Sequence, residues 1–402
     1  MKVFFINPPF KAEYGKFSRE NRSPAITRSG ALYYPLWLIY AAAVCEKDGF
    51  EVCFLDAPAR PLNEEESLSV VRRDGQGTKL FVLDTSTPSI YSDIKFAEKL
   101  KEMFPESKVV LVGTHPSALP EETLCISEQI DAVARHEFDY IVRDLARAVR
   151  DDGSWSNVKG ITYRENGEIY ATEDMPFIEQ LDDIPFAAEF IKKYLNPEDY
   201  FFAPAAFPEI QIFSGRGCMA RCDFCVYPQT MHGHRYRLRT PENVAAEFEY
   251  IAQNFPDVKE IVFEDDTFTV KKERVIAICE LLIQKGLHKR FRWLCNARVN
   301  LDLETMKKMK QAGCHLIIPG IESSDQQILN NIKKGITIRQ VYEYVANARK
   351  AGLLVHACYM VGNNGETRET MQGTLKLALK LNTDTAQFYP LLPFPGTKAY
   401  AW

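Results

Sequence analysis

Three cysteines lie close together near the middle of this 402-residue chain. They are Cys218, Cys222 and Cys225, spaced C-x3-C-x2-C directly after the apolar run EIQIFSG. Thiolates bind zinc and iron–sulfur clusters. Zinc sites usually combine two short Cys or His elements into four ligands, whereas the next cysteine here, Cys279, lies far along the chain in a predicted helix. Three thiolates therefore favour a 4Fe-4S cluster whose fourth iron stays open to another ligand.

The residues around these cysteines suit a cluster. Gly215 and Gly217 let the backbone turn tightly and offer N–H groups to cluster sulfur. The segment CMARCDFC, with the aromatic Phe224 before its third cysteine, resembles the signature of the radical S-adenosylmethionine (SAM) superfamily. That resemblance implies that the open iron binds SAM and that the reduced cluster cleaves it to a 5′-deoxyadenosyl radical. The alternative from another class is a non-catalytic iron–sulfur or zinc module.

Later segments resemble the same superfamily and imply further contacts with SAM. FEDDTF places acidic oxygens where relatives meet the SAM ammonium, and NAR places a guanidinium near its carboxylate. Helix capping and a surface ion pair are the structural alternatives for these two segments. GIES and the YMVGNNGET segment follow, the latter with Asn363-Asn364 where many relatives have Leu-Pro. The residues expected to bind SAM are Phe224, Glu264, Asp265, Arg298, Glu322 and Gly362. No side chain is assigned a catalytic role of its own.

The first half of the chain resembles the cobalamin-binding domains that precede some radical SAM cores. The resemblance rests on NPPF, YYPLWLIYAAA, TSTPS and GTHPSALPEETL. It implies cobalamin contacts from Asn7, Thr85, Ser86, Ser89, Gly113, Thr114, His115, Pro116 and Ser117. The cobalt-ligating D-x-H-x-x-G motif is absent after the first strand. His115 is better explained by a role in its turn than by cobalt ligation.

The elements that must position these residues form two series. Residues 1–150 alternate short apolar runs with helical patterns, which predicts an α/β domain with a doubly wound parallel sheet. Its ligand should bind beyond the carboxyl ends of the strands, at segments that include Arg135-His136-Glu137. Residues 151–207 read as a connector with one hairpin, turned at Asn166-Gly167. A second βα series fills residues 208–402, and its six predicted strands fit a partial (β/α)6 TIM-like barrel with the site at their carboxyl ends.

The remaining polar candidates carry less chemistry. His232 and His234 fit a solvated loop better than a two-residue metal site. Seven cysteines lie inside apolar patterns and behave as small hydrophobes: Cys45, Cys53, Cys125, Cys279, Cys295, Cys314 and Cys358. The chain ends at Trp402, directly after the sixth predicted strand, so we expect either a short natural protein or a fragment that lacks a final helix.

Composition limits the partners and the location. The formal charge of −5 is spread without a basic run, so nucleic acid is not expected as a partner. No segment reads as a signal peptide or as a membrane span, and a cytoplasmic location is expected.

Together these features predict a radical SAM enzyme that carries out cobalamin-dependent methylation of an unactivated carbon. Ring closure or rearrangement by the same cofactors is the alternative. A small-molecule substrate and an electron donor such as flavodoxin or ferredoxin are implied.

Overall fold

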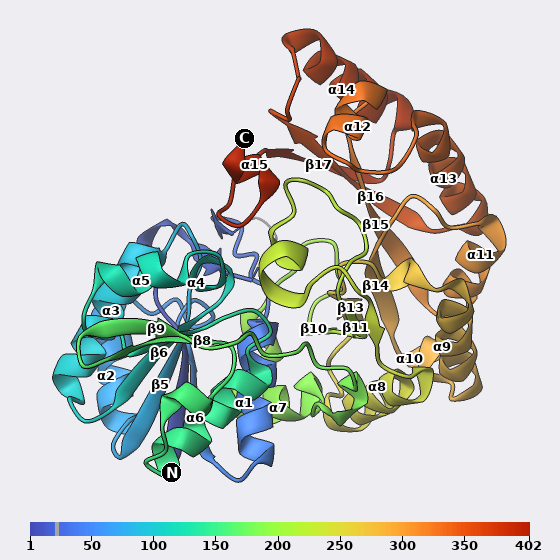
Figure 1. The fold of residues 1–402 in the computed structure, drawn as a ribbon. Helices are drawn as coiled ribbons and strands as arrows, with labels where there is room; N and C mark the ends of the chain where they lie inside the picture. Colours follow the sequence, from blue (N-terminus) through green and yellow to red (C-terminus); the bar gives the residue numbers. More distant parts are fainter. Residues whose placement is uncertain (21–23) are drawn as a thin grey trace.

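The computed structural model describes residues 1–20 and 24–402, which form two lobes (Figure 1). The first lobe is built on a seven-stranded sheet, whose strands in spatial order are β4 (Glu51–Asp56), β1 (Lys2–Asn7), β5 (Thr78–Asp84), β6 (Lys108–Val112), β7 (Ala132–Ala134), β8 (Ile161–Glu165) and β9 (Glu168–Ala171). The first five strands run parallel to one another. β8 is antiparallel to both of its neighbours, β7 and β9. The predicted parallel α/β arrangement of this half is confirmed.

Helices cover both faces of this sheet because its strands are apolar on both sides. On β5, Val82 packs in one core and Phe81 in the core of the opposite face. The first face carries α1 (Leu36–Lys47) and α6 (Asp139–Arg150), which pack on each other. The second carries α2 (Glu64–Asp74), α3 (Ile90–Met103) and α5 (Pro120–Ile126). This is the doubly wound layering that continuous apolar strands dictate.

The hairpin predicted in the connector is present, and it extends the first sheet. Asn166 and Gly167, the two residues between β8 and β9, have φ angles of 53° and 86°. Positive φ at both positions is the backbone that a tight two-residue hairpin turn requires. β8 then pairs with β7, so the hairpin forms the sheet edge. The boundaries at residues 150 and 207 stay predictions.

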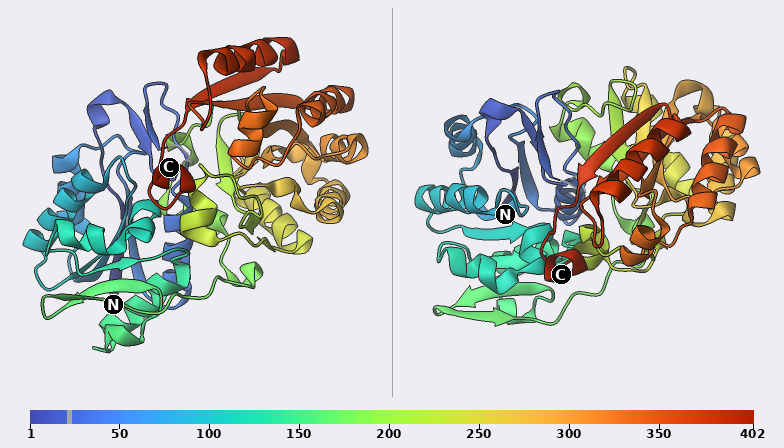
Figure 2. Two further views of the ribbon diagram at one scale, coloured as in Figure 1. Left: turned by 45° about the horizontal axis from the view of Figure 1, so that its top comes forward. Right: turned by 90° about the horizontal axis from the view of Figure 1, so that it is seen from above.

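The second lobe is an arc of six parallel strands with helices on its outside (Figures 1 and 2). In order these are β10 (Glu209–Ile212), β13 (Glu260–Phe263), β14 (Arg292–Ala297), β15 (Cys314–Glu322), β16 (Leu354–Val361) and β17 (Thr385–Pro390). All six predicted strands are confirmed. Among the described residues no pairing joins the first of these strands to the last, so the sheet is an open arc.

Local sequence signals set the outer helices. These helices are α8 (Pro241–Asn254), α9 (Lys272–Gln284), α11 (Leu303–Gln311), α13 (Ile338–Ala351) and α14 (Arg368–Leu381). Thr240 accepts a hydrogen bond from the Asn243 N–H and Pro241 takes the first helical position, as predicted. Gly313, at φ 97°, turns the chain from α11 into β15. Among the described residues, none of the helices is long and apolar enough to cross a bilayer.

Short elements complete the chain. They are α4 (Thr114–Ala118), α7 (Ala187–Tyr194), α10 (Leu287–Arg290), α12 (Gln326–Asn331), α15 (Lys398–Ala401), β2 (Lys16–Ser18), β3 (Ala25–Thr27), β11 (Gly215–Arg216), β12 (Arg237–Leu238), the π-helix Pro228–His232 and the 3-10 turns Ala12–Tyr14, Trp155–Asn157, Leu181–Asp183, Pro197–Asp199 and Phe268–Val270.

The lobes share a continuous interior. One apolar core runs from Val3 in β1 through α1 to Phe394 near the C-terminus. Tyr34 donates from its hydroxyl to the Glu209 carbonyl 3.0 Å away, which ties the first lobe to the first strand of the second. The C-terminal segment lies between the lobes (Figure 2), where the Ala399 N–H donates to the Asp223 carbonyl at 3.0 Å. Phe213 and Glu264, which directly follow β10 and β13, line a cavity together with Glu20 and Tyr33, so the carboxyl ends of these strands face the first lobe.

Candidate cluster and SAM site

The three cysteines lie on one excursion of the chain between β11 and β12. We call residues 217–236 the cluster loop. Gly217 opens it at φ 95°, and a Cβ there would lie 2.8 Å from the carbonyl carbon of Arg235. Only glycine therefore allows the two ends of the loop to close on each other. Cys218 and Cys222 are buried, Cys225 is partly exposed, and none of the ten cysteines forms a disulfide.

The cysteines face one cavity of about 230 Å³ at the carboxyl ends of the barrel strands. Within residues 1–20 and 24–402, no three His, Cys, Asp or Glu side chains meet at the spacing of a single-ion site. A cubane cluster differs from such a site because each thiolate binds a different iron. The three thiols need only line the same cavity, and they do.

Charged side chains line the same cavity beside the cysteines. Of the residues predicted to contact SAM, the structure brings together Phe224, Glu264, Arg298 and Glu322. The other two face elsewhere. The Asp265 carboxylate accepts from the N–H and the hydroxyl of Ser214, both at 2.6 Å. The Gly362 N–H donates to the Glu366 carboxylate at 2.6 Å.

The cavity also contains charged residues that the sequence patterns did not single out. Asp266, next to the predicted Asp265, lines it, and so does Lys334 from the segment after α12. Lys334 Nζ lies 2.6 Å from the Glu322 carboxylate. Burial alone would lower the pKa of Lys334, but Glu322 and Cys222 raise it, so the ammonium stays charged. A Cβ on Gly320 would lie 2.6 Å from Lys334 Nζ, so glycine gives this buried pair its room.

The rest of the cavity wall is largely apolar. Tyr33, Phe202, Ile318 and Phe394 are among its apolar lining residues. His356 lines the same cavity. Burial lowers its pKa, which favours the neutral ring. The cavity thus combines charged side chains with a largely apolar wall.

The strand ends of the first lobe form a separate buried polar network. Asn7 donates to Asp56 at 2.8 Å, and Thr85 and Ser89 each donate to Asp93 at 2.6 Å. The Ser86 and Ser89 hydroxyls lie 3.0 Å apart. Three of the residues expected at a cobalamin site, Thr85, Gly113 and Thr114, line a cavity of about 10 Å³ there.

Near the turn at His115, two buried polar atoms lack a hydrogen-bond partner among the described residues. The Ser117 hydroxyl donates to the Gly113 carbonyl at 2.7 Å, and Pro116 is buried beside it. His115 Nδ1 lies 3.2 Å from the Thr87 hydroxyl. Its Nε2 and the Asp84 Oδ2 are buried with no hydrogen-bond partner among the described residues. Both atoms lie at the carboxyl edge of the sheet, where ligands bind in such folds.

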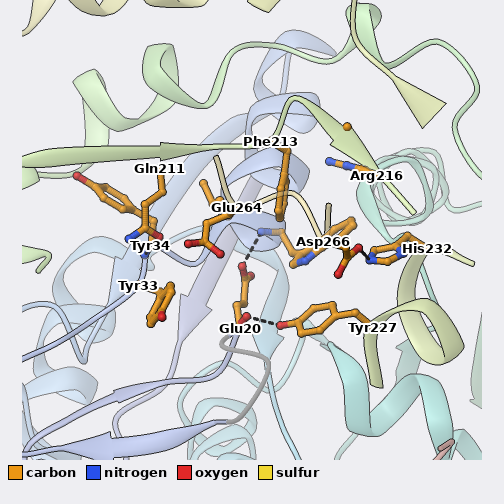
Figure 3. A pocket seen from close by; sticks show the side chains of 13 residues that line it. Glu20, Tyr33, Tyr34, Gln211, Phe213, Arg216, Tyr227, His232, Glu264 and Asp266 are labelled. Atoms are coloured by element: carbon orange, nitrogen blue, oxygen red, sulfur yellow. Dashed lines mark hydrogen bonds and ion pairs between the residues drawn. The ribbon is translucent and has the colours of Figure 1, made fainter. Parts of the chain in front are cut away.

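A third cavity, of about 30 Å³, lies between the lobes (Figure 3). Glu20 accepts from the Trp37 and Leu38 N–H groups at the start of α1, at 2.8 and 3.1 Å. His232 faces Asp266, with Nε2 2.6 Å from the carboxylate. His234 takes a different place, with Nδ1 3.2 Å from the Cys218 carbonyl and 3.0 Å from that of Ala220. The prediction of a solvated loop is therefore wrong for His232, which is buried against Asp266.

Comparison with known proteins places this geometry in a family. Residues 212–378 match the model of the Radical SAM superfamily, and residues 22–146 match the B12 binding domain. An uncharacterized methyltransferase from Pyrococcus horikoshii is 31% identical over 405 residues, spanning all of this chain and 83% of the relative. The anaerobic magnesium-protoporphyrin IX monomethyl ester cyclase of Cereibacter sphaeroides is 27% identical, over 91% of this chain and 60% of the cyclase.

Two solved structures share the fold. The radical SAM methyltransferase TsrM from Kitasatospora setae superposes with a TM-score of 0.76 at 16% identity, over 98% of this chain and 74% of that one. The cobalamin-dependent enzyme OxsB has a TM-score of 0.74 at 16% identity, over all of this chain and 54% of that one. Because sequence similarity to the Pyrococcus relative extends over the full chain, the protein belongs to the radical SAM superfamily, in the branch with an N-terminal B12-binding domain.

Proposed function

We propose that this radical SAM enzyme methylates an unactivated carbon of a small-molecule substrate. The observation that carries the proposal is the shared cavity of Cys218, Cys222 and Cys225 with Glu264, Arg298 and Glu322. When bound, the 4Fe-4S cluster supplies the electron that cleaves SAM, and cobalamin supplies a carrier for the methyl group. The three thiols and the cavity around them fit the cluster together with SAM.

The charged side chains suit the amino-acid part of SAM. Glu264 and Asp266 offer carboxylate oxygens to the ammonium. Lys334 and Arg298 offer cations to the carboxylate, although one Arg298 nitrogen already donates to the Lys334 carbonyl. Glu322, held by Lys334, faces the same space. We assign the SAM site to these residues rather than to Asp265 and Gly362.

The apolar wall supports radical chemistry by keeping water away. Tyr33, Phe202 and Phe394 reach the cavity from three separate segments, two of them before the barrel and one after it. A reactive carbon radical held between apolar side chains has few neighbours to react with other than the bound substrate. The same wall favours a substrate with an apolar reacting end.

The residues of the first lobe fit the polar periphery of cobalamin. Asp84 Oδ2 and His115 Nε2 are available there, and Thr85, Gly113 and Thr114 border the cavity beside them. The two cavities between the lobes are smaller than a corrin ring. Binding therefore requires the space between the lobes, which Glu20 borders in both cavities, to widen. We derive no cobalt ligand from this arrangement.

Ring closure is the second candidate, because a relative named as a monomethyl ester cyclase matches 91% of this chain. Both candidates need an outside reductant, and we propose a flavodoxin or ferredoxin. A reducing compartment such as the cytoplasm would keep the cluster thiols available.

The experiment is anaerobic reconstitution of the cluster followed by SAM and dithionite. We expect 5′-deoxyadenosine from the wild type and none from Cys222→Ala, while Cys279→Ala, a buried cysteine on α9, serves as the matched control and retains activity. Equal release by both variants would refute the cluster assignment. Labelled methyl from SAM in a product distinguishes methylation from ring closure.

A further inference from the structure

Four buried charges join the first lobe to the cluster loop. Glu137 lies between β7 and α6, and Asp139 begins α6, while Arg216 and Arg237 come from the second lobe. Each of the four is at most 4% exposed. One Arg216 nitrogen lies 2.8 Å from Glu137 and 2.9 Å from Asp139, and Arg237 lies 2.5 Å from Glu137. Two carboxylates and two guanidinium groups make the cluster of charges neutral.

The two arginines occupy the base of the cluster loop. Arg216 lies on β11 and Arg237 on β12, and the two residues pair directly across this antiparallel ladder. All three cysteines lie between them. Glu137 therefore holds both ends of the loop with its two carboxylate oxygens, one for each arginine.

Burial makes this arrangement stiff. Burial alone would raise the pKa of Glu137, but Arg216 and Arg237 bring it below its usual value, so the carboxylate is ionised. Moving either arginine would leave a charge unpaired in the interior, which is far costlier than breaking a surface pair. The Arg216 guanidinium also lies over the Trp37 and Tyr40 rings of α1, 4.5 and 5.1 Å from their centres.

Neighbouring contacts point the same way. His136 Nδ1 lies 2.8 Å from the Thr230 carbonyl within the loop. Arg237 donates to the His232 carbonyl at 3.1 Å, also within the loop. Tyr227 of the loop also donates from its hydroxyl to the Glu20 carbonyl of the first lobe. The tie from Tyr34 to Glu209, in contrast, reaches the barrel without touching the loop. The arginines and Glu137 thus tie the first lobe to the base of the loop.

We propose that Glu137 is a positioning residue, which fixes the orientation of the cluster loop, and so of SAM bound there, relative to the first lobe. The part that concerns methyl transfer rests on the function proposed above. The part that concerns the loop does not need any cofactor.

The first test measures hydrogen–deuterium exchange of the full chain without cofactors. In Glu137→Gln the amide faces one guanidinium with an N–H donor, so we expect the amides of residues 217–236 to exchange about tenfold faster or more. Amides of β15 should stay at the wild-type rate. Leu145→Ala, a buried position on α6 away from the loop, is the control for general loss of stability. Wild-type loop exchange in Glu137→Gln, or equal acceleration in Leu145→Ala, would overturn the proposal.

The second test compares two products of SAM in one reconstituted sample with cobalamin and reductant. S-adenosylhomocysteine reports transfer of the methyl group, and 5′-deoxyadenosine reports cleavage within the barrel. We expect the ratio of S-adenosylhomocysteine to 5′-deoxyadenosine to fall roughly tenfold to a hundredfold in Glu137→Gln, because a small misplacement of the reacting groups lowers the rate by about that factor. The ratio should stay constant in Leu145→Ala. A constant ratio in both would refute the positioning role.

Two further results keep the tests separate. If Glu137→Gln fails to fold, Arg237→Lys is the second variant, because it keeps the net charge of the four groups at zero but removes the guanidinium geometry. The same faster exchange in the loop and the same fall in the product ratio are expected. If the wild type releases no S-adenosylhomocysteine, the proposed methylation fails, while the exchange measurement still decides whether Glu137 holds the loop.

Discussion

Substituting alanine for Gly217 tests whether the backbone at the start of the cluster loop governs cluster assembly. Gly217 has a φ of 95°, and the added methyl group would lie 2.8 Å from the Arg235 carbonyl carbon and overlap its oxygen. The obstacle is backbone, which cannot rotate away as a side chain would. Gly167 is the matched control, because it has a φ of 86° and no atom within 4 Å of the added methyl.

The magnitude follows from two costs. A left-handed backbone costs a non-glycine residue roughly 1–2 kcal/mol, and both variants incur it. Overpacking against fixed atoms costs about 1–3 kcal/mol more, and only Gly217→Ala incurs it. The closed loop is then disfavoured by about 2–5 kcal/mol, which lowers its population by a factor of roughly 30 to several thousand.

Iron and acid-labile sulfide per chain, measured after anaerobic reconstitution, check this expectation. Gly217→Ala should retain about a tenth of the wild-type cluster or less, while Gly167→Ala should retain nearly all of it. Full cluster content in Gly217→Ala, with wild-type visible absorption, would show that the loop closes another way and would refute the reasoning.

Three other predictions concern buried ionisable groups. Chemical denaturation should show Glu137→Gln less stable by about 3–5 kcal/mol, with a smaller loss in the Glu137→Gln/Arg237→Gln double variant, because the double variant restores neutrality; equal losses would contradict this. Lys334→Met should make the cluster harder to reduce, by on the order of 50 mV, in an EPR-monitored redox titration, since a cation beside Cys222 is removed; an unchanged potential would contradict it. Burial raises the pKa of Glu209 from 4.5 to about 8, so its contribution to stability is complete below pH 4.5 and is lost as the pH rises toward 8. Glu209→Gln should therefore flatten the fall in melting temperature between pH 5 and pH 8, and an identical profile would count against a buried, protonated Glu209.

Much of the fold was predictable because periodicity and turn chemistry are local properties. The six barrel strands follow from apolar runs at regular spacing, and the Asn166-Gly167 turn follows from the need for positive φ. The pairing of that hairpin with β7 was not predicted, since strand partners depend on edges that only the assembled sheet offers. The Glu20 carboxylate at the start of α1 escaped prediction because it lies 17 residues before Trp37, whose N–H group donates to it.

The site shows the same division. Phe224, Arg298 and Glu322 were named from motifs, and the structure brings them to the cysteines. Asp265 and Asp266 follow a strand in a loop without a fixed period, so the pattern could not tell which carboxylate faces the cavity and which anchors Ser214. Lys334 was visible as a lysine, but its burial beside Glu322 comes from the fold.

The sequence by itself identified Cys218, Cys222 and Cys225 as the proposed ligands of the cluster, because three thiols this close in the chain can reach one site, and it determined the alternation of strands and helices around them. Tertiary structure alone decided where that loop points. Arg216 and Glu137 are 79 residues apart, and no local pattern links them. Their pairing arises because the two sheets bury complementary charges at one interface, where an unpaired charge would be too costly to keep.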